Sequence, residues 1–90
     1  MTASEAVAMT AYFVVTEAVA NTLKHARAST IHVVVGPHRG GLRVEVSDDG
    51  AGGARPAFGL TSIRDRVASV GDELTVRSPA GAGTMIRATF

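Results

Sequence analysis

The sequence contains no cysteine and no tryptophan, and its aromatic residues are one tyrosine and three phenylalanines. Without cysteine the fold has neither a disulfide nor a thiolate zinc site, which is typical of a reducing compartment. No uninterrupted apolar run approaches the roughly 18 to 20 residues of a spanning helix. Residues 1–5 also lack the basic segment and apolar stretch of a signal peptide. These absences predict a cytoplasmic domain with an aliphatic core and no direct membrane insertion.

The sequence also has no marked excess of either charge: it contains nine Lys and Arg residues and eight Asp and Glu residues, for a formal net charge of +1. The basic residues are scattered and form no stripe that could follow a nucleic-acid backbone, so no nucleic-acid partner is expected. Ninety residues, 46% of them hydrophobic, are enough for one core and too few for two. We therefore expect residues 1–90 to form a single domain without internal repeats.

Two segments have the periodicity of helices. Residues 4–28 contain neither Gly nor Pro and repeat apolar residues at steps of three and four, which predicts one long helix with Ser4 as its N-cap. Residues 60–70 place Ile63, Val67 and Val70 on one side and predict a second helix. Ser62 and Asp65 have the spacing of a capping box, which would begin that helix.

Two hairpins account for the rest of the regular structure. Strands are predicted at Thr30–Val35, Leu42–Ser47, Leu74–Ser78 and Thr84–Phe90, with turns at Pro37–Gly41 and Pro79–Gly83. The order α-β-β-α-β-β is most economically packed as two helices on one face of a four-stranded sheet. The expected fold class is therefore an α+β two-layer sandwich with a mixed, mainly antiparallel sheet.

The first helix carries a polar stripe. Glu17, Asn21, Lys24 and His25 fall at i, i+4, i+7 and i+8, so they lie along one side of a helix with 3.6 residues per turn. A carboxylate, an amide and a cation in one stripe suit a phosphate and its metal ion. The same residues also suit an ordinary solvated helix face.

Two glycine-rich segments follow at strand ends, Asp48-Asp49-Gly50-Ala51-Gly52 and Gly81-Ala82-Gly83-Thr84. Each alone resembles a hairpin turn, but glycine also lets backbone amides approach a ligand closely. The sequence has no P-loop and no strand-linked G-x-G-x-x-G motif, and its three histidines share no metal-ligand spacing. Together with the helical stripe, the two segments suggest a nucleotide site of another type.

This combination resembles the GHKL-type ATPases. Residues 17–25 resemble their N box, residues 48–52 the G1 box and residues 81–84 the G3 region, while residues 58–67 are similar to the G2 segment and following helix of NarL- and DesK-type sensor histidine kinases. The resemblance extends from about Ala11 to Phe90 and implies a Bergerat-type ATP-binding fold. The G1 box fits only from Asp48, because a start at Asp49 would need glycine at Ala51.

The resemblance implies ATP and Mg²⁺ as cofactors. Asp48 would accept a hydrogen bond from the adenine amino group, with Thr84 supporting the same edge of the base. Asn21 would give an oxygen to Mg²⁺, a hard ion that keeps most of its waters. Glu17 would orient or deprotonate the nucleophile, and Lys24 would offset phosphate charge. The remaining nucleotide-binding positions implied by the resemblance are His25, Gly50, Gly52, Gly59, Leu60, Gly81 and Gly83.

Two departures from the family pattern affect the expected site. The G2 segment has Ala57 where a glycine is usual, so nucleotide affinity could be modest. The lid between Gly53 and Phe58 is very short, which would leave the triphosphate open to a partner. The family also places a strand before the first helix, and this chain has no room for it, so it resembles a fragment of a longer protein.

The acceptor histidine is expected elsewhere. Family members phosphorylate a histidine followed by an acidic residue, whereas His25, His32 and His38 here precede Ala26, Val33 and Arg39. The chain is therefore expected to bind and activate ATP but not to phosphorylate itself. The partner would be a dimerisation and phosphoacceptor helix in the same or a partner kinase, with a response regulator downstream; membrane anchoring of the parent protein is left open.

The leading interpretation is the catalytic domain of a protein histidine kinase in two-component signalling. An anti-sigma-factor serine kinase with the same boxes is one alternative. A non-catalytic module that keeps the fold for nucleotide binding or protein interaction is another, motivated by Ala57 and the short lid. A dimerisation helix bearing His-Asp or His-Glu would distinguish the first, and absence of ATP binding would favour the last.

Overall fold

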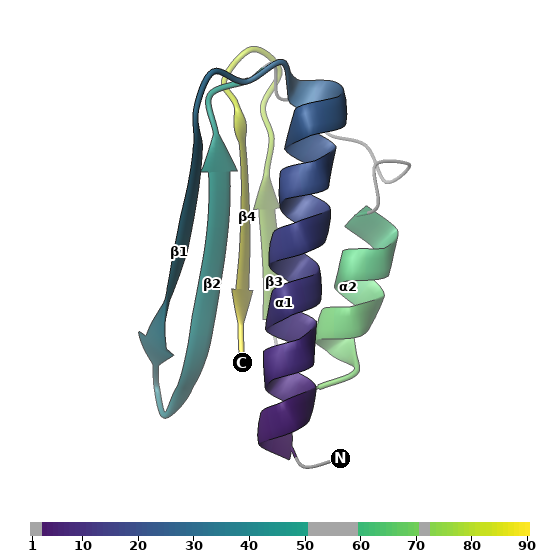
Figure 1. Cartoon of the computed structure of the whole chain (residues 1–90), viewed down its shortest axis with the longest axis vertical. Helices are drawn as coiled ribbons and strands as arrows, with labels where there is room; N and C mark the ends of the chain where they lie inside the picture. The colour runs from purple at the N-terminus through teal and green to yellow at the C-terminus, as the bar shows by residue number, and fades with distance from the viewer. Residues whose placement is uncertain (1–2, 51–59, 71–72) are drawn as a thin grey trace.

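The chain forms two layers, with helices α1 and α2 packed on one face of a four-stranded sheet (Figure 1). The computed structural model describes residues 3–50, 60–70 and 73–90; for Ala3, His25 and Ala26 it describes the backbone alone. The elements in chain order are α1 (Ala3–Asn21), the π-helical turn η1 (Thr22–Ala26), β1 (Ile31–His38), β2 (Gly41–Asp48), α2 (Leu60–Ala68), β3 (Glu73–Arg77) and β4 (Thr84–Thr89).

The strands lie in the order β1-β2-β4-β3. β1 and β2 form the first hairpin, β3 and β4 form the second, and β2 pairs with β4 between them. Every pairing among the described strands is antiparallel. The predicted fold class, helices on one face of a four-stranded α+β sheet, is confirmed, but the described sheet is wholly antiparallel where a mixed sheet was predicted, because both hairpins and the β2–β4 pair run antiparallel.

The helix ends differ from their predictions. α1 changes at Thr22 into η1, and the chain leaves the helix at Arg27, whose φ of 51° is left-handed. Ser4 lies inside α1, so its prediction as N-cap is wrong. Ser62 is likewise inside α2, which begins at Leu60, so the predicted capping box is wrong as well. An N-cap residue needs non-helical backbone angles, and a residue within the first turn cannot supply them.

The first hairpin is longer than predicted, because Pro37 and His38 belong to β1 and not to the turn. The turn is only Arg39-Gly40, and both residues have positive φ, 49° and 79°, as two-residue hairpin turns require. Asp49 N donates to Thr30 O over 3.4 Å, so hydrogen-bonded pairs alternate from that pair along the hairpin. In this alternation the nitrogen of Pro37 points away from β2, where a missing N–H costs nothing.

The core lies between the helices and the sheet. Among the described residues its buried members are all aliphatic, as the composition predicted: Ala11, Val14, Ala18, Val44, Val46, Leu60, Ile63, Val67, Ile86 and Ala88, with Phe13 and Phe90 partly buried against them. Ile63 and Val14 have no exposed surface, and burying a side chain of this size stabilises a fold by about 1.5 to 3 kcal/mol. The alanines of α1 let the helix approach the sheet closely, which positions its C-terminal end beside the end of β2.

By length and composition alone, Ser4–Lys24 could cross a membrane, with a mean hydropathy of 1.3 in its most apolar window. This segment is not an uninterrupted apolar run, because it contains Glu5 and Glu17. The core helix of a two-layer domain meets the same criteria, and α1 buries Ala11, Val14 and Ala18 against the rest of the fold.

Candidate functional site

Four element ends meet at one end of the molecule. α1 ends there, β2 ends there, and β4 and α2 begin there (Figure 1). The antiparallel register places Asp48 of β2 directly opposite Thr84 of β4. The fold therefore gathers Asn21, Asp48 and Thr84, which are far apart in the sequence, at the same end.

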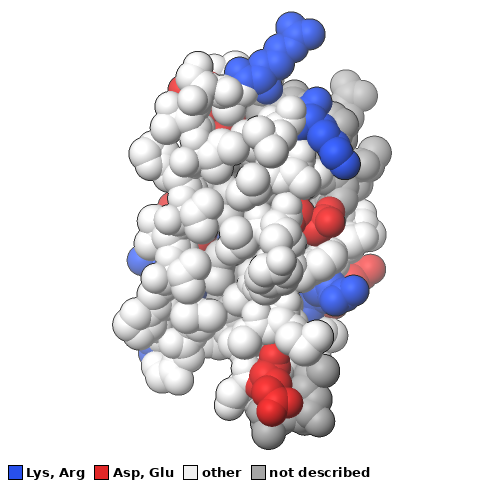
Figure 2. Space-filling view, in the orientation of Figure 1, with Lys and Arg blue, Asp and Glu red and all other residues white. Residues whose placement is uncertain are grey.

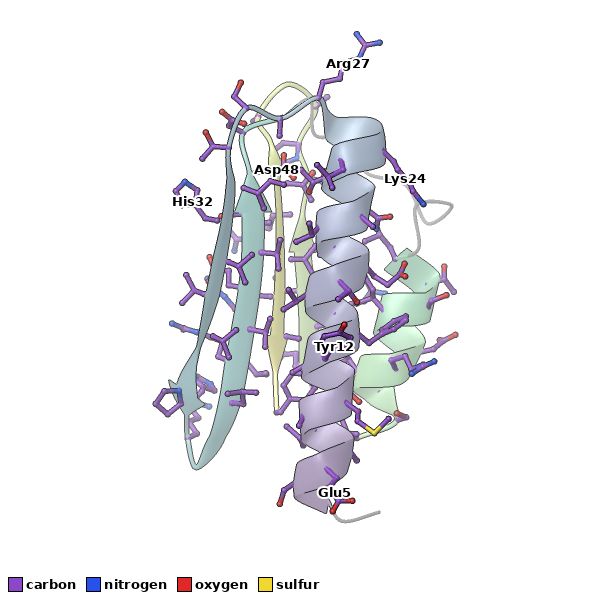
Figure 3. All side chains as sticks on the ribbon, viewed as in Figure 1. Glu5, Tyr12, Lys24, Arg27, His32 and Asp48 are labelled. Carbon is purple, nitrogen blue, oxygen red and sulfur yellow. The ribbon has the colours of Figure 1, made fainter. Side chains whose placement is uncertain are left out.

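The Asp48 carboxylate accepts one hydrogen bond at each of its two oxygens. Thr22 Oγ1 donates to Asp48 Oδ2 over 3.0 Å, and the Gly50 backbone N–H donates to Asp48 Oδ1 over 2.8 Å. Thr22 is buried, and its single hydroxyl hydrogen is shared between Asp48 Oδ2 and the Ala18 carbonyl oxygen, which lies 3.1 Å from Oγ1. Figure 3 shows Asp48 between the end of β2 and the upper part of α1. The carboxylate is thus fixed in position, and each oxygen retains capacity to accept a further hydrogen bond.

The adjacent Asp49 has a different environment. Its Oδ1 accepts hydrogen bonds from the backbone N–H groups of Ser29 and Thr30 at 2.8 and 2.9 Å. These bonds, from Thr30 first and Ser29 second, lower the pKa of the Asp49 carboxyl, because they favour its charged form. Asp49 is exposed and ties the segment before β1 to the end of β2. The two neighbouring carboxylates therefore have different roles: Asp48 bonds to Thr22, and Asp49 bonds to the segment before β1.

Asn21 is the last residue of α1 and precedes η1 directly. Its Nδ2 atom is buried and has no hydrogen-bond partner within the described part of the chain. Leaving such a donor unpaired costs about 1 to 3 kcal/mol, and π-helical turns are frequent at functional sites. The amide offers a nitrogen that suits a phosphate oxygen and an oxygen that suits Mg²⁺. The residue present therefore fits the predicted ligand.

Gly81 and Gly83 in the β3–β4 turn are under different structural constraints. Gly83 has a φ of 78°, and a Cβ there would lie 2.2 Å from the Asp48 carbonyl oxygen. Gly81 has a φ of 80°, but a Cβ there would meet nothing within 4 Å. Thr84 follows and its Oγ1 shares a 2.6 Å hydrogen bond with Ser78 Oγ. Gly83 is thus required by the packing of β4 against β2, whether or not a ligand is bound.

Glu17 and Lys24 are charged members of the predicted stripe. Glu17 lines a cleft of about 430 Å³ between α1 and α2, together with Phe13, Ser62, Asp65, Arg66 and Ser69. The Arg66 guanidinium lies over the Phe13 ring, 4.4 Å from its centroid. Lys24 belongs to η1, is exposed and points away from β1 (Figure 3). Of the predicted stripe, the structure thus places Glu17 beside α2, while Thr22, which was not part of the stripe, faces Asp48.

The structure describes only some of the other predicted positions. The Gly50 amide is occupied by Asp48, and Leu60, the first residue of α2, is part of the core. Gly52, Gly59 and Ala57 lie outside the described residues, as does the His25 side chain. In the described ranges there is no cluster of three or more His, Cys, Asp or Glu side chains that could hold a metal ion. A metal here would need ligands from a nucleotide beside Asn21.

Sequence reasoning missed the residues that position the site. Thr22 belonged to no predicted motif, although its place beside Asn21 and its hydroxyl were available signals. Ser78 lay in no motif, and Asp49 was only an unspecified position within the G1 box. All three act on residues that the sequence did identify, or on the loop beside them.

Comparisons with known proteins identify the family of the chain. Residues 6–90 match the family of histidine kinase-, DNA gyrase B- and HSP90-like ATPases. The nitrate/nitrite sensor protein NarQ of Escherichia coli is 37% identical over 84 residues, which are 86% of this chain and 15% of NarQ. The sensor histidine kinase LiaS of Bacillus subtilis is 33% identical over 81% of this chain and 22% of LiaS.

A solved structure shows the same fold. The blue-light activated histidine kinase of Erythrobacter litoralis superposes with a TM-score of 0.69 and 28% identity, over 84% of this chain and 27% of that one. The chain thus spans about a quarter or less of the length of these relatives. It belongs to the histidine kinase-, DNA gyrase B- and HSP90-like ATPases, as a catalytic ATPase domain of the kind found in NarL-type sensor histidine kinases.

Proposed function

We propose that this domain binds Mg-ATP where α1, β2 and β4 meet, and supplies the γ-phosphate to a histidine on a separate dimerisation helix. The observation that carries the proposal is the buried, unpartnered amide of Asn21, directly before the residue that bonds to Asp48. The unpartnered amide and the fixed carboxylate together offer hydrogen-bonding groups to a ligand. The sensor histidine kinases among the relatives support a histidine as acceptor.

Asp48 is the proposed reader of the base. Its oxygens are fixed by Thr22 and Gly50, and each can accept one more hydrogen bond. An adenine amino group is a donor, whereas guanine presents an oxygen at the corresponding position, so a fixed carboxylate selects adenine. Thr84, opposite Asp48 in the register, supports the same edge of the base. This part of the site would supply specificity.

Asn21 and the α2 side of α1 would serve the triphosphate. Mg²⁺ bound there would neutralise phosphate charge, with Asn21 as its protein ligand. Lys24, exposed in η1, would offset the remaining charge. Glu17 lies one helical turn earlier and opens onto the cleft beside α2, so it would orient the incoming histidine or accept its proton from that side.

The remaining positions complete the proposed site. They are His25, Gly50, Gly52, Gly59, Leu60, Gly81 and Gly83, and for these the support is the match of residues 6–90 to the ATPase family. We also propose that residues 1–90 act as one catalytic unit in the cytoplasm and that a response regulator receives the phosphate next. A parent protein would provide the acceptor helix and any membrane anchor.

Titration calorimetry with ATP and Mg²⁺ tests the binding site. Asp48→Asn should weaken ATP binding roughly tenfold or more, equivalent to about 1.4 kcal/mol, because the amide places a donor where the base needs an acceptor. Asp49→Asn is the matched control, since it removes the adjacent charge without touching the face toward α1, and it should leave affinity unchanged. Equal losses in both variants would refute the assignment of Asp48.

Phosphoryl transfer needs its own assay. Incubated alone with γ-labelled ATP, the chain should incorporate no label, since none of its histidines has the acceptor context. With a histidine-bearing dimerisation domain of a sensor kinase supplied in trans, label should appear on that domain as an acid-labile phosphohistidine. Wild-type protein that binds no ATP at millimolar concentration would instead favour the non-catalytic interaction module.

A further inference from the structure

A row of polar side chains crosses the sheet at the end where the proposed nucleotide site lies. The β2–β4 register pairs Asp48 with Thr84, and continuing the β3–β4 register by one step places Ser78 opposite Thr84. The preceding pair in the sheet, Val46 and Ile86, is buried in the core, and strand residues two apart lie on the same face. Asp48, Thr84 and Ser78, here called the polar row, therefore lie on the helix-covered face, directly beyond the core.

Two members of the polar row share a hydrogen bond whose direction matters. The hydroxyl oxygens of Ser78 and Thr84 lie 2.6 Å apart, and either can be the donor. Both residues are half-buried. A hydroxyl has one hydrogen to donate and two lone pairs that accept. When Ser78 donates, the Thr84 hydrogen stays available to a ligand; when Thr84 donates, its oxygen can only accept from a ligand.

The proposed base needs a donor beside the Asp48 carboxylate. Adenine presents an amino group, which donates, next to the ring nitrogen N1, which accepts; guanine presents an oxygen and an N–H group at the same two positions. The Asp48 carboxylate, which is bonded to Thr22, is the proposed acceptor for the amino group. Its neighbour in the polar row, Thr84, then has to donate to N1. An acceptor beside a donor matches adenine at both atoms and opposes guanine at both.

The charges at this end of the molecule favour the same orientation of the nucleotide. Figure 2 shows basic side chains on the surface where α1 and η1 end, and Lys24 and Arg27 are exposed there (Figure 3). The polar row lies next to the core, and its one charged member, Asp48, would repel a phosphate. The triphosphate is therefore drawn to the exposed cations, which leaves the uncharged base for the polar row.

We propose that Ser78 is a positioning residue for base recognition: its hydroxyl donates to Thr84 and so directs the Thr84 hydrogen to N1 of adenine. Ser78 acts on the base only through Thr84. The inference rests on the proposed binding of ATP and adds a second point of base selection to that of Asp48. Ser78 follows β3 and precedes the β3–β4 turn, so it lies outside the glycine motif of residues 81–84.

Titration calorimetry with ATP and with 1-deaza-ATP, in which a C–H group replaces N1, tests the role of Ser78. The wild type should bind ATP roughly fivefold more tightly than the analogue, as expected for one hydrogen bond. Ser78→Asp should abolish this preference, because a carboxylate only accepts and would take the Thr84 hydrogen. The added charge weakens binding of both nucleotides alike, so the ratio of the two affinities isolates the hydrogen bond. Ser78→Thr keeps a hydroxyl and should keep the wild-type ratio.

Ser47→Asp is the matched control. Ser47 directly precedes Asp48 in β2, so its side chain lies on the opposite face of the sheet. The same added charge there should leave the ratio of the two affinities unchanged. Circular dichroism should show every variant folded. Should Ser78→Asp unfold, Ser78→Ala replaces it and should lower the ratio, because the Thr84 hydroxyl is then free to turn.

The outcomes separate this inference from the proposed function. A wild type that binds ATP without preferring it to 1-deaza-ATP would overturn the role of Ser78 and leave ATP binding intact. The same holds for a full preference that survives loss of the Ser78 hydroxyl, or for a preference lost equally in Ser47→Asp. A wild type that binds no ATP would overturn both the proposed function and this inference.

Discussion

The hydroxyl of Thr22 donates to Oδ2 of Asp48 over 3.0 Å and so joins the C-terminal end of α1 to the end of β2. Asn21, the preceding residue, has a buried amide with no partner in the described ranges. One hydrogen bond thus links the residue beside this amide to the carboxylate, in addition to the packing of α1 against β2. Disturbing that bond should affect both groups.

Thr22→Val should weaken both the fold and the proposed ATP site. Valine keeps the shape of threonine but leaves Asp48 Oδ2 without its donor, and a hydrogen bond to a charged group stabilises a fold by roughly 1.5 to 3 kcal/mol. Urea unfolding should show a loss near the lower value, because Asp48 is only half buried. Calorimetry should show ATP affinity reduced roughly tenfold, or about 1.4 kcal/mol.

Thr16→Val is the control for this substitution. Thr16 Oγ1 also bonds to carbonyls of its own helix, at 3.0 and 3.1 Å, but it contacts no carboxylate. Its valine variant should keep wild-type ATP affinity. A loss of affinity in Thr16→Val as large as that in Thr22→Val would show that β-branched packing, and not the bond to Asp48, is responsible.

Asn21→Ala should separate stability from function. Removing a buried donor that has no partner relieves a desolvation cost of about 1 to 3 kcal/mol, and alanine is the better helix former. We therefore expect an unfolding free energy equal to or above that of the wild type. ATP binding should weaken in the presence of Mg²⁺ and change little with EDTA. Equal losses of affinity with and without the metal would contradict the role of Asn21 toward Mg²⁺.

The sequence predicted the architecture because the periodicity of each segment was clear. Alternation in residues 42–47 and the three- and four-residue repeat in α1 follow directly from side-chain geometry. The first hairpin was shortened wrongly because Pro37 was read as a turn residue. Its nitrogen faces the free edge of β1, where proline is compatible with a strand, and that orientation depends on the register with β2.

The motifs of the site could be predicted from the sequence, but the contacts that hold the motif residues in place could not. Asp48 was chosen over Asp49 from the glycine pattern, and the structure gives the two carboxylates different contacts. The bond from Thr22 to Asp48 spans 26 residues of sequence, so no local pattern contains it. The position of Glu17 in a cleft beside α2 likewise depends on where α2 packs.

The Asp49 carboxyl should make stability depend on pH. Its two backbone hydrogen bonds lower its pKa in the folded chain, so its contribution is fully present above its ordinary pKa. That contribution is lost as pH falls through the lowered value in the folded state. Asp49→Ala should therefore be less stable than the wild type at neutral pH, and the difference should shrink on acidification. Chemical denaturation across the acidic range measures it; a difference that grows toward low pH would contradict the assignment.

Gly83 and Gly81 allow a paired test of what the β3–β4 turn requires. Both have positive φ, so alanine at either should cost roughly 1 to 2 kcal/mol of left-handed strain. Gly81→Ala should cost no more, since its Cβ would meet open space. Gly83→Ala must in addition push a Cβ away from the Asp48 carbonyl, 2.2 Å distant. Backbone cannot yield as a flexible side chain does, so the loss should exceed about 3 kcal/mol.

The same pair shows how the turn is coupled to the site. Moving the Asp48 backbone also moves the carboxylate that Thr22 and Gly50 hold, so Gly83→Ala should lower ATP affinity in the fraction that remains folded, while Gly81→Ala should not. Thermal unfolding and calorimetry on both variants measure the two effects separately. Equal destabilisation by the two substitutions would mean that β4 can withdraw from β2 without cost, and the close packing at Gly83 would then not be what fixes the end of β2.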